Sequence, residues 1–410
     1  MAPPAPCSWA SRRNSPGLPI LPTIPTTSSF TTNRPRAVTS PSPHPDSAST
    51  VRLTVDLGAL ADNWRTMRDL SGSARCGAAV KADGYGTGAD QAAPRLLREG
   101  CRDFFVADAT EGARLRPALP GARIYVLNGV FEGSFAQTLS HDMIPVINST
   151  EQAAFWLAHA ASRPYALQVD TGMNRLGLTP EQAVAHSQSD APQPCLVMSH
   201  FACADDPDHP LNAGQIKTFQ GLADCFPDIE ASLANSGGIH LGARAHHQLT
   251  RPGIALYGGE AVNGVANRML PVVTAEARVL VLRHAQAGQS VSYGAAHRLT
   301  RDSRIAVCGV GYADGFHRSG SGAGVPLRAS VAEGAMGAIN GVRVPVLGKI
   351  TMDLTMFDVT DLPEGSVQAG DWIELMGPTI DVEEAATAAG TISYEMLTSL
   401  GRRYERHYRG

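Results

Sequence analysis

The sequence of 410 residues predicts an α/β fold, a (β/α)8 TIM barrel followed by a mainly antiparallel β domain. From residue 75 onward, short apolar or β-branched runs alternate with helical segments at spacings of roughly 20 to 35 residues, which is typical of repeated βα units. After about residue 270, strands separated by glycine replace this pattern, as in VLVLRHAQAGQSVSYG and VPVLGKITMDLTMFDV. This change places a boundary between two domains near residue 269.

Eight runs predict the strands of the barrel, and several are followed by residues that favour a helix start. The run at 144–148 precedes Ser149 and Glu151, which suit a helix N-cap and a first turn. Polar side chains at the ends of several runs agree with a TIM barrel, because chemistry in that fold gathers at the carboxyl ends of the strands. The predicted strands are residues 77–82, 104–108, 124–129, 144–148, 165–170, 195–200, 230–236 and 251–258.

Other elements are expected before the barrel and near the end of the chain. Residues 1–50 are dense in Pro, Ser and Thr and have no acidic residue before Asp46, which predicts a disordered extension. Scarce acids are typical of a transit peptide, but the prolines oppose its amphipathic helix, so a translation start assigned too far upstream is the other interpretation. Residues 51–268 are expected to form the barrel, with 51–60 a candidate partner strand for the β domain at 269–410. One amphipathic helix is predicted from residue 382 to about 403, interrupted at Gly390.

Composition and charge exclude several classes of protein. A balance of 43% hydrophobic and 18% charged residues suits two globular domains with real cores. No run of 18 apolar residues predicts a membrane span, and a net charge of −4 lacks the basic excess of a nucleic-acid binder. Seven cysteines without a C-x-x-C pair indicate reduced thiols, so we expect a cytoplasmic protein whose partners are small molecules or copies of itself.

Lys81 is the first candidate for chemistry, because it ends a strand predicted to be buried and precedes a glycine-rich turn. Burial disfavours the ammonium form and lowers the pKa of the amine, which a Schiff-base lysine requires. A lysine that only reaches solvent from a strand end is the alternative interpretation.

The segment around this lysine, AVKADGYGTGA, is very similar to the cofactor-binding segment of alanine racemases. The resemblance continues through separated motifs in the family order over nearly all of residues 52–400. It implies pyridoxal 5'-phosphate (PLP) as the cofactor, Lys81 as its Schiff-base lysine and one racemisation base, and Tyr85 as a phosphate-binding hydroxyl.

Three further barrel motifs imply roles for polar residues. DTGMNRLG resembles the segment whose arginine, here Arg175, contacts the substrate carboxylate and the cofactor, a task suited to the paired donors of a guanidinium. The motif SHF implies that His200 contacts the catalytic tyrosine, and the turn ANSGG implies that Ser236 binds the phosphate. Taken alone, Arg175 would be assigned to the surface and His200 to a structural role.

The motif TRPGI implies that Arg251 hydrogen-bonds the pyridine nitrogen of PLP, with Gly253 and Ile254 also binding the cofactor. Most PLP enzymes place a carboxylate there to keep that nitrogen protonated. An arginine leaves the nitrogen unprotonated, which weakens the electron withdrawal and favours racemisation over side reactions such as transamination.

The motif VSYGA in the β domain resembles the segment that supplies the second base, Tyr293. Moving a proton from one face of Cα to the other needs an acid/base group on each face, and Lys81 holds only one. A phenol has an ordinary pKa near ~10. We therefore expect a chain from Tyr293 through His200 to Arg251 that brings this pKa toward ~7 to 8.

The remaining motifs imply contacts with substrate and phosphate. GYADG and GKITMD resemble the family's substrate-access and carboxylate-recognition segments, with Tyr312, Met352 and Asp353 near the substrate. ISYE implies a phosphate-binding Tyr394, a residue that alone would be assigned to core packing. In the family the tyrosine base and the two substrate segments come from the other subunit, which implies a head-to-tail homodimer.

Two positions depart from the family pattern. Gln168 stands where many members carry a carbamylated lysine that orients the arginine, here Arg175, so an amide or a bound anion has to replace that charge. Thr351 stands where a cysteine is common. These differences leave open a broader racemase that acts on serine or other amino acids.

The resemblance as a whole implies interconversion of L-alanine and D-alanine, with D-alanine supplied for peptidoglycan. A decarboxylase of the same barrel class fits less well, because it places an acidic residue where Arg251 stands, and a PLP-carrier module lacks the β domain. His246 and His247 are adjacent and no H-x-x-x-H or Cys/His ligand set occurs, so no metal site is predicted.

Overall fold

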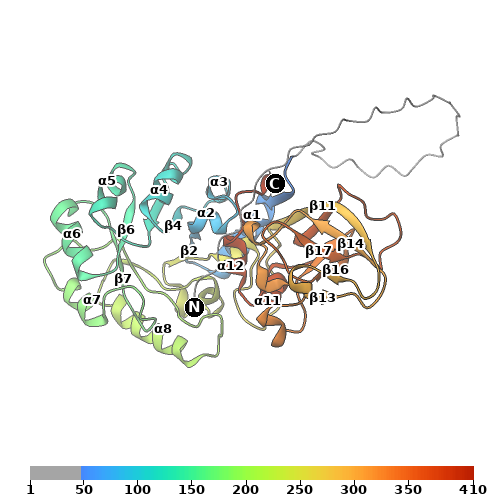
Figure 1. Ribbon diagram of the computed structural model, residues 1–410. Coiled ribbons are helices and arrows are strands. Elements are labelled where there is room, and N and C mark those ends of the chain that lie inside the picture. Colours follow the sequence, from blue (N-terminus) through green and yellow to red (C-terminus); the bar gives the residue numbers. More distant parts are fainter. Residues whose placement is uncertain (1–47) are drawn as a thin grey trace, which may run out of the picture. The chain divides into compact units, whose positions relative to one another are not determined.

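The computed structural model describes residues 48–410, so the predicted extension at residues 1–50 lies almost entirely outside the described residues. Within this range, seven parallel strands form one sheet in which each strand pairs with the next along the chain. Helices α4 to α8 lie around these strands in Figure 1, as expected of repeated βα units. The strands are β3 (Ala78–Ala79), β4 (Asp103–Val106), β5 (Arg123–Val126), β6 (Ile144–Ile147), β7 (Ala166–Gln168), β8 (Leu196–Met198) and β9 (Glu230–Ser232).

Side chains that cap the first turn fix where several barrel helices begin. Asp108, Ser149 and Thr179 each accept a hydrogen bond from a backbone N–H of the helix that follows. The helix start predicted at Ser149 is confirmed. The helices of this part are α1 (Leu57–Leu70), α2 (Lys81–Tyr85), α3 (Ala89–Arg98), α4 (Ala109–Leu115), α5 (Glu132–Ser140), α6 (Thr150–Ala160), α7 (Pro180–Ser187), α8 (Pro210–Ala223), α9 (Ser236–His240) and α10 (Ala243–His246).

A further strand closes the ring of strands. This strand, β10 (Leu249–Thr250), pairs in parallel with β2 (Arg75–Cys76). On its other side, the Gln248 N–H donates to the Ala231 carbonyl of β9 at 3.1 Å. The TIM-type barrel predicted from the sequence is therefore confirmed.

The predicted position of the eighth strand, residues 251–258, was wrong. The strand itself ends at Thr250, and the last backbone bonds to its neighbours are those from the Arg251 N–H to the Ala234 carbonyl and from the Ala79 N–H to the Pro252 carbonyl, both 2.9 Å. Residues Ile254–Tyr257 form instead a 3₁₀ helix, η2. The apolar run that predicted a strand is buried in this turn, because each of its four residues is at most 1% exposed.

The second half of the chain forms the predicted antiparallel domain. Within residues 48–410 its sheet has eight strands in the order β14-β17-β16-β15-β18-β11-β1-β19. Strand β11 also pairs with β14, so the sheet from β14 to β11 closes on itself. The strands of this sheet are β1 (Val51–Asp56), β11 (Val273–Ala285), β14 (Ser303–Cys308), β15 (Met336–Ile339), β16 (Val342–Leu347), β17 (Thr355–Asp358), β18 (Trp372–Met376) and β19 (Glu405–Arg409), and β12 (Ser290–Val291) and β13 (His297–Arg298) form a separate hairpin.

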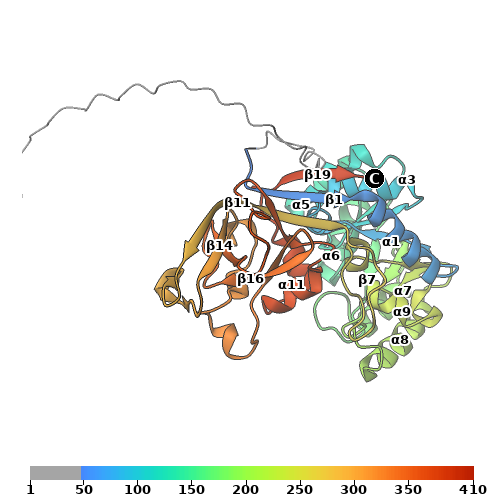
Figure 2. The ribbon, with the colours of Figure 1, turned by 90° about the vertical axis from the view of Figure 1, so that its right-hand side faces the viewer.

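Strand β1 ties the first residues of the described chain to the second domain. It pairs antiparallel with β11 and parallel with β19, and its buried side chains alternate with half-buried ones. Figure 2 shows β1 and β19 side by side before the chain enters α1. The barrel helices thus begin only after the chain has contributed one strand to the other domain.

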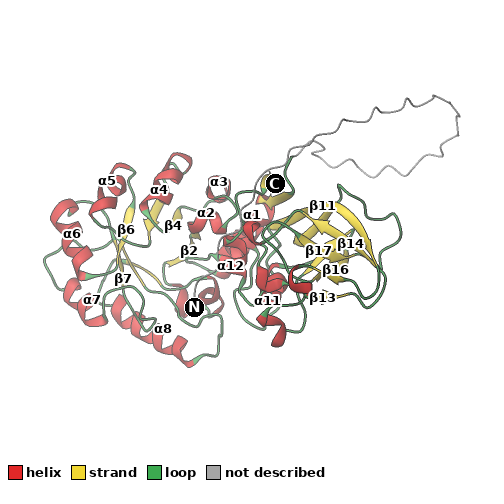
Figure 3. Cartoon of the chain, viewed as in Figure 1, coloured by secondary structure: helices red, strands yellow, loops and turns green. Residues whose placement is uncertain are grey.

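The C-terminal helix predicted from 382 to about 403 is two short helices. These are α11 (Val382–Ala388) and α12 (Ser393–Thr398), and Figure 3 shows the chain's helices and strands by colour. Gly390 separates them with φ +69°, a left-handed conformation that favours glycine and ends the first helix. The chain then continues into β19, a strand that was not predicted.

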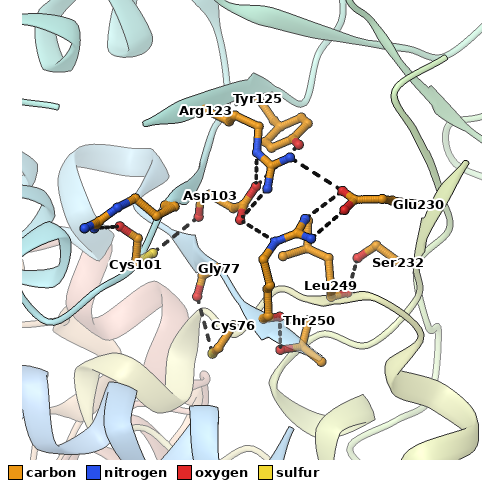
Figure 4. Close-up of polar contacts among 12 residues, drawn as sticks. Cys76, Gly77, Cys101, Asp103, Arg123, Tyr125, Glu230, Ser232, Leu249 and Thr250 are labelled. Carbon is orange, nitrogen blue, oxygen red and sulfur yellow. Dashed lines mark hydrogen bonds and ion pairs between the residues drawn. The ribbon is translucent and has the colours of Figure 1, made fainter. Parts of the chain in front are cut away.

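Paired charges lie at the amino ends of the barrel strands. Asp103 begins β4 and is 1% exposed, and its carboxylate accepts from Arg75 at 3.3 Å and from Arg123 at 3.1 Å. Glu230 accepts from Arg75 at 2.6 Å and lies 3.5 Å from Arg123. Figure 4 shows Arg123 between Asp103 and Glu230. Two arginines and two carboxylates, the basal cluster, therefore link four strands with no net charge.

Three further findings concern the described residues. No helix in residues 48–410 combines the length and the apolar character needed to cross a bilayer. Six cysteines, Cys76, Cys101, Cys195, Cys203, Cys225 and Cys308, are free thiols, and no group of His, Cys, Asp or Glu in the same range could hold a metal ion.

Candidate active site

Nine of the predicted site residues line one cavity at the carboxyl ends of the barrel strands. Its volume is about 700 Å³, which is enough for a cofactor-sized molecule. Residues of α12 complete its wall, so both halves of the chain contribute. The nine are Lys81, Tyr85, Arg175, His200, Ser236, Arg251, Gly253, Ile254 and Tyr394.

Lys81 follows the buried strand β3 and starts an unusual turn. Ala82, Asp83 and Gly84 have φ between 53° and 63° and ψ near 46°, which is left-handed helical backbone. Each non-glycine residue in this conformation costs roughly 1–2 kcal/mol, so such turns persist only where contacts hold them. Burial lowers the pKa of Lys81, and the positive charge of Arg175 lowers it further. A larger share of the amine is therefore neutral and nucleophilic at a given pH.

Hydroxyl groups gather at one end of the cavity. The Tyr85 ring stacks on Tyr257 with centroids 4.6 Å apart, and the Tyr394 ring lies 6.1 Å from it. Gly253 is required beside Tyr85, because a Cβ there would lie 2.2 Å from the Tyr85 hydroxyl oxygen. Burial raises the pKa of Tyr394 to about 12. Both phenols thus remain protonated donors at neutral pH.

Ser236 adds a third hydroxyl at this end. Its Oγ accepts the Gly253 N–H at 2.8 Å and the Ala255 N–H at 3.4 Å, which leaves its own proton for another acceptor. Ser236 is the first residue of α9, and Ile254 is the first residue of η2. The first N–H groups of a helix lack intrahelical acceptors. This end of the cavity is therefore rich in donors, which suits a phosphate.

Arg251 and His200 form a hydrogen-bonded pair in the wall of the cavity. Arg251 is 5% exposed; its Nη2 donates to the Ser199 carbonyl at 2.6 Å and to His200 Nδ1 at 3.3 Å. Burial, together with the positive charges of Arg251, Arg175 and Lys81, lowers the pKa of His200 to about 3. The imidazole is therefore neutral at physiological pH. Since a guanidinium can only donate, His200 Nδ1 accepts and its proton lies on Nε2.

Arg175 extends from the loop after β7 with no ion pair or hydrogen bond to another residue in the range 48–410. An Asx turn, in which Asp170 accepts from the Gly172 and Met173 N–H groups, begins this loop. Gln168, at the expected position of the modified lysine, is buried and lines the same cavity. The free guanidinium is placed to bind a carboxylate that enters from solvent.

Four predicted residues of the second domain, unlike Tyr394, do not line this cavity within a single chain. Tyr293 is 74% exposed, Tyr312 is 43% exposed and Met352 is 53% exposed, and Asp353 pairs with Arg403 at 2.8 Å. In the expected chain from Tyr293 through His200 to Arg251, only the second contact therefore exists inside one molecule.

Two residues that support the site were missed in the sequence. Tyr257 packs on Tyr85 and donates to the Ala79 carbonyl at 3.0 Å, but the run containing it was assigned to a strand. Glu111 accepts from the Ala82 N–H beside Lys81. The pattern D-A-T-E that begins α4 was a signal, because an acidic residue three positions after an N-cap often binds backbone N–H groups.

The two halves of the chain match two known families. Residues 55–261 match the family described as "Alanine racemase, N-terminal domain", and residues 272–408 match "Alanine racemase, C-terminal domain".

Individual proteins are similar over most of their length. An alanine racemase of Rhizobium meliloti (strain 1021) is 55% identical over 366 residues, which are 88% of this chain and 97% of the relative. A protein of Agrobacterium fabrum (strain C58 / ATCC 33970) named "Alanine racemase, biosynthetic" is 54% identical over 365 residues, 87% of this chain and 93% of the relative. The solved structure of alanine racemase from Bartonella henselae with covalently bound pyridoxal phosphate has a TM-score of 0.80 and 35% identity, covering 88% of this chain and 100% of that chain.

Proposed function

This chain belongs to the alanine racemase family, and we propose that it interconverts L-alanine and D-alanine with PLP held by Lys81. The observation that carries the proposal is that Lys81, Arg175 and Arg251 converge on one cavity, while none of them makes an ion pair within the described range. Unpaired cations around a cavity are costly unless an anion enters. A phosphate and a substrate carboxylate are the anions that this reaction brings.

The residues present fit PLP. The Lys81 amine would attach it, and the hydroxyls of Tyr85, Ser236 and Tyr394 would hold its phosphate beside the N–H of Ile254. Arg251 would donate to its ring nitrogen from the cavity wall. When bound, PLP supplies an electron sink that makes the α-proton of an attached amino acid acidic.

Lys81 and Arg175 have different roles on one face of the substrate. Arg175 binds the carboxylate with a charge that it cannot lose, which fixes the direction of the Cα–H bond. The lowered pKa of the Lys81 amine suits it to take and return the proton at Cα.

The second base in this proposal is Tyr293 of a partner subunit. The proton on His200 Nε2 makes that nitrogen a donor, which would stabilise the phenolate form of the tyrosine when the tyrosine reaches it. Tyr293 does not line the cavity described for residues 48–410, and its side chain is 74% exposed. It therefore cannot act on a substrate held by its own chain. We therefore propose a head-to-tail homodimer in which the barrel, residues 51–268, faces the partner's β domain, residues 269–410.

Exposed apolar side chains support such a dimer. Leu176 and Ile392 lie at the cavity and are 44% and 60% exposed. On the β domain, Tyr312, Met352 and Leu354 are also exposed. Apolar side chains gathered at a functional site indicate a surface that is covered in the assembly. Tyr312, Met352 and Asp353 would then approach the substrate from the partner subunit.

Mixing two inactive variants tests the shared site. Lys81→Ala and Tyr293→Phe homodimers should each be inactive, whereas subunit exchange should create hybrids with one intact site and restore about a quarter of the parental activity. No recovery after exchange, with hybrids verified by native mass spectrometry, would show that the tyrosine does not act across subunits.

The activity itself is tested by the time course of optical rotation when PLP-loaded protein meets L-alanine, with L-serine and L-lysine in parallel. We expect decay to zero, fastest for alanine. Tyr293→Phe should lose this decay and keep the absorbance band of attached PLP. The chain has three lysines, Lys81, Lys217 and Lys349, so borohydride reduction and peptide mass spectrometry identify the attachment site directly. A normal cofactor band without loss of rotation for any of the three amino acids would favour a PLP carrier, or a decarboxylase of an amino acid other than these three.

We also propose that this protein acts in the cytoplasm and has a biosynthetic role, in which its D-alanine is used as a precursor of peptidoglycan. The word "biosynthetic" in the name of the 54% identical relative supports a role in making D-alanine rather than in degrading it. The free thiols of the described range fit a reducing compartment.

A further inference from the structure

The backbone that follows Lys81 is held in a conformation that its sequence does not favour. Ala82, Asp83 and Tyr85 have φ of 53°, 55° and 53°, and Gly84 between them has φ 63°. L-residues rarely adopt left-handed helical backbone in succession, because Cβ crowds the following carbonyl oxygen. Backbone bonds from the Gly84 N–H to Val80 and from the Gly86 N–H to Ala82, both 2.9 Å, do not remove this crowding, so contacts from outside the turn are also needed to maintain it.

The carboxylate of Glu111 supplies such contacts. One oxygen accepts the Ala82 N–H at 2.7 Å, and the other accepts the Ala107 N–H at 2.8 Å. Ala107 directly follows β4, the strand that pairs with β3. The carboxylate thus bridges the turn that carries Lys81 to the end of the neighbouring strand.

A second residue on the same face of α4 reaches the same turn. Arg114 lies three residues after Glu111 and pairs with the Asp83 carboxylate, which also accepts the Ala89 N–H at 3.0 Å. The Arg114–Asp83 pair is about half exposed, so its contribution is weaker than that of the two charge-assisted bonds of Glu111.

We propose that Glu111 is a positioning residue for Lys81: its carboxylate holds the left-handed turn so that the Lys81 amine points into the cavity for attachment of PLP. The proposal rests on the attachment of PLP at Lys81 proposed above. Glu111 is also the acidic group that acts on the Lys81 ammonium and keeps its pKa from falling further. One carboxylate therefore affects both the direction and the charge state of the amine.

Two substitutions separate these effects. Glu111→Gln keeps the length of the side chain but replaces one acceptor with an NH₂ that faces an N–H donor. Glu111→Asp keeps the charge but is one methylene too short to bridge both N–H groups. Glu151→Gln is the matched control, since Glu151 lies in the first turn of α6 and does not line the cavity.

The first readout is the rate at which the cofactor-free chain attaches added PLP, followed by the absorbance of the attached cofactor. Both Glu111 variants should attach PLP about tenfold more slowly or worse, because misplacement of a reacting group by an ångström is enough for such a loss. The control should match the parent. Parental rates in both variants would overturn the proposal, and so would a slow Glu111→Gln beside a normal Glu111→Asp, since charge alone would then explain it.

The second readout does not involve PLP. The pH midpoint for acetylation of Lys81 in the cofactor-free chain, followed by peptide mass spectrometry, should fall by about 1 unit in Glu111→Gln and stay near the parental value in Glu111→Asp. A purely structural role of Glu111 would leave the pH midpoints of both variants unchanged. That result would contradict the proposal. If the parent itself fails to attach PLP, the proposed function fails instead. Loss of cooperative melting in both variants would also overturn the positioning role, because that role requires a folded chain.

Discussion

The two ends of the barrel differ in how their charged side chains are paired. At the amino ends of the strands, Arg75 and Arg123 are matched by Asp103 and Glu230 in the basal cluster (Figure 4). At the carboxyl ends, Lys81, Arg175 and Arg251 converge without an ion pair in the described part of the chain. Oppositely charged side chains that pair with one another contribute to stability and are not available to a ligand. Charged side chains without a partner lower the stability of the fold but can bind a ligand of opposite charge.

The largest effect that this comparison predicts is on activity at the carboxyl end. Lys81→Ala should reduce interconversion of alanine more than about 10⁴-fold, because attachment and one base are lost together. Its melting temperature should equal or exceed that of the parent without cofactor, since a half-buried ammonium next to Arg175 is removed. Polarimetry and calorimetry measure the two effects, with the exposed Lys217→Ala as control. A large loss of stability would contradict the view that this charge serves a ligand.

At the amino end, the effect should fall on stability instead. Asp103→Ala leaves Glu230 to pair with two guanidinium groups that are each 39% exposed, and should lower the free energy of unfolding by about 2–3 kcal/mol. Urea denaturation measures this change, and activity per folded molecule should stay within about twofold of the parent. Asp69→Ala is a suitable control, since Asp69 is exposed and its ion pair is with its neighbour Arg68. Equal stability of the two variants would mean that the basal cluster is not a structural device.

The buried His200 at the carboxyl end should make the stability of the fold depend on pH. The pKa of His200 is about 3 in the folded chain, below the ordinary 6.5, so the unfolded chain binds more protons between these values. The contribution of the neutral imidazole to stability is complete above about pH 6.5 and is lost as the pH falls toward 3. At pH 5 the loss should be about 2 kcal/mol, and His200→Gln should not show it. Urea denaturation at pH 7.5 and pH 5 of both proteins makes the test, and equal acid sensitivity would contradict the buried neutral state.

Much of the barrel half of the site was predictable because its residues sit in motifs at strand ends. Such ends meet at one rim in a closed parallel barrel, so the strand-end residues Lys81, Arg175, His200 and Ser236 were expected to be neighbours before the fold was known. Arg251 began its predicted strand, and only the family resemblance implied its contact with His200. The position of the eighth strand was not predictable from hydrophobicity, since buried 3₁₀ and strand segments have the same apolar composition. The C-terminal helix failed for a similar reason, because a single glycine was taken as an interruption rather than an end.

The contacts of Glu111 were harder to predict. They depend on a left-handed turn whose sequence, Ala-Asp-Gly-Tyr, contains a single glycine, and local propensity opposes that conformation. Neither the turn nor the carboxylate that holds it follows from either residue alone. The packing of α4 against α2 and the end of β4 brings them together.

The smallest predicted effect lies within the basal cluster itself. The side chain of Glu230 is 32% exposed, against 1% for Asp103, so water already screens its attraction to the two arginines, and Asp103 still pairs with both of them after Glu230 is replaced. Glu230→Gln should therefore lower the free energy of unfolding by about 1 kcal/mol, well below the effect of Asp103→Ala. Hydrogen bonding to Arg75 lowers the pKa of the Glu230 carboxyl from its ordinary 4.5, so this contribution is complete above that pH and is lost as the pH falls below it. Denaturation at pH 7 and at pH 4 should accordingly show a difference between parent and Glu230→Gln that shrinks in acid. A difference as large as that of Asp103→Ala would mean that connection of the strands, rather than burial of charge, sets the strength of the cluster.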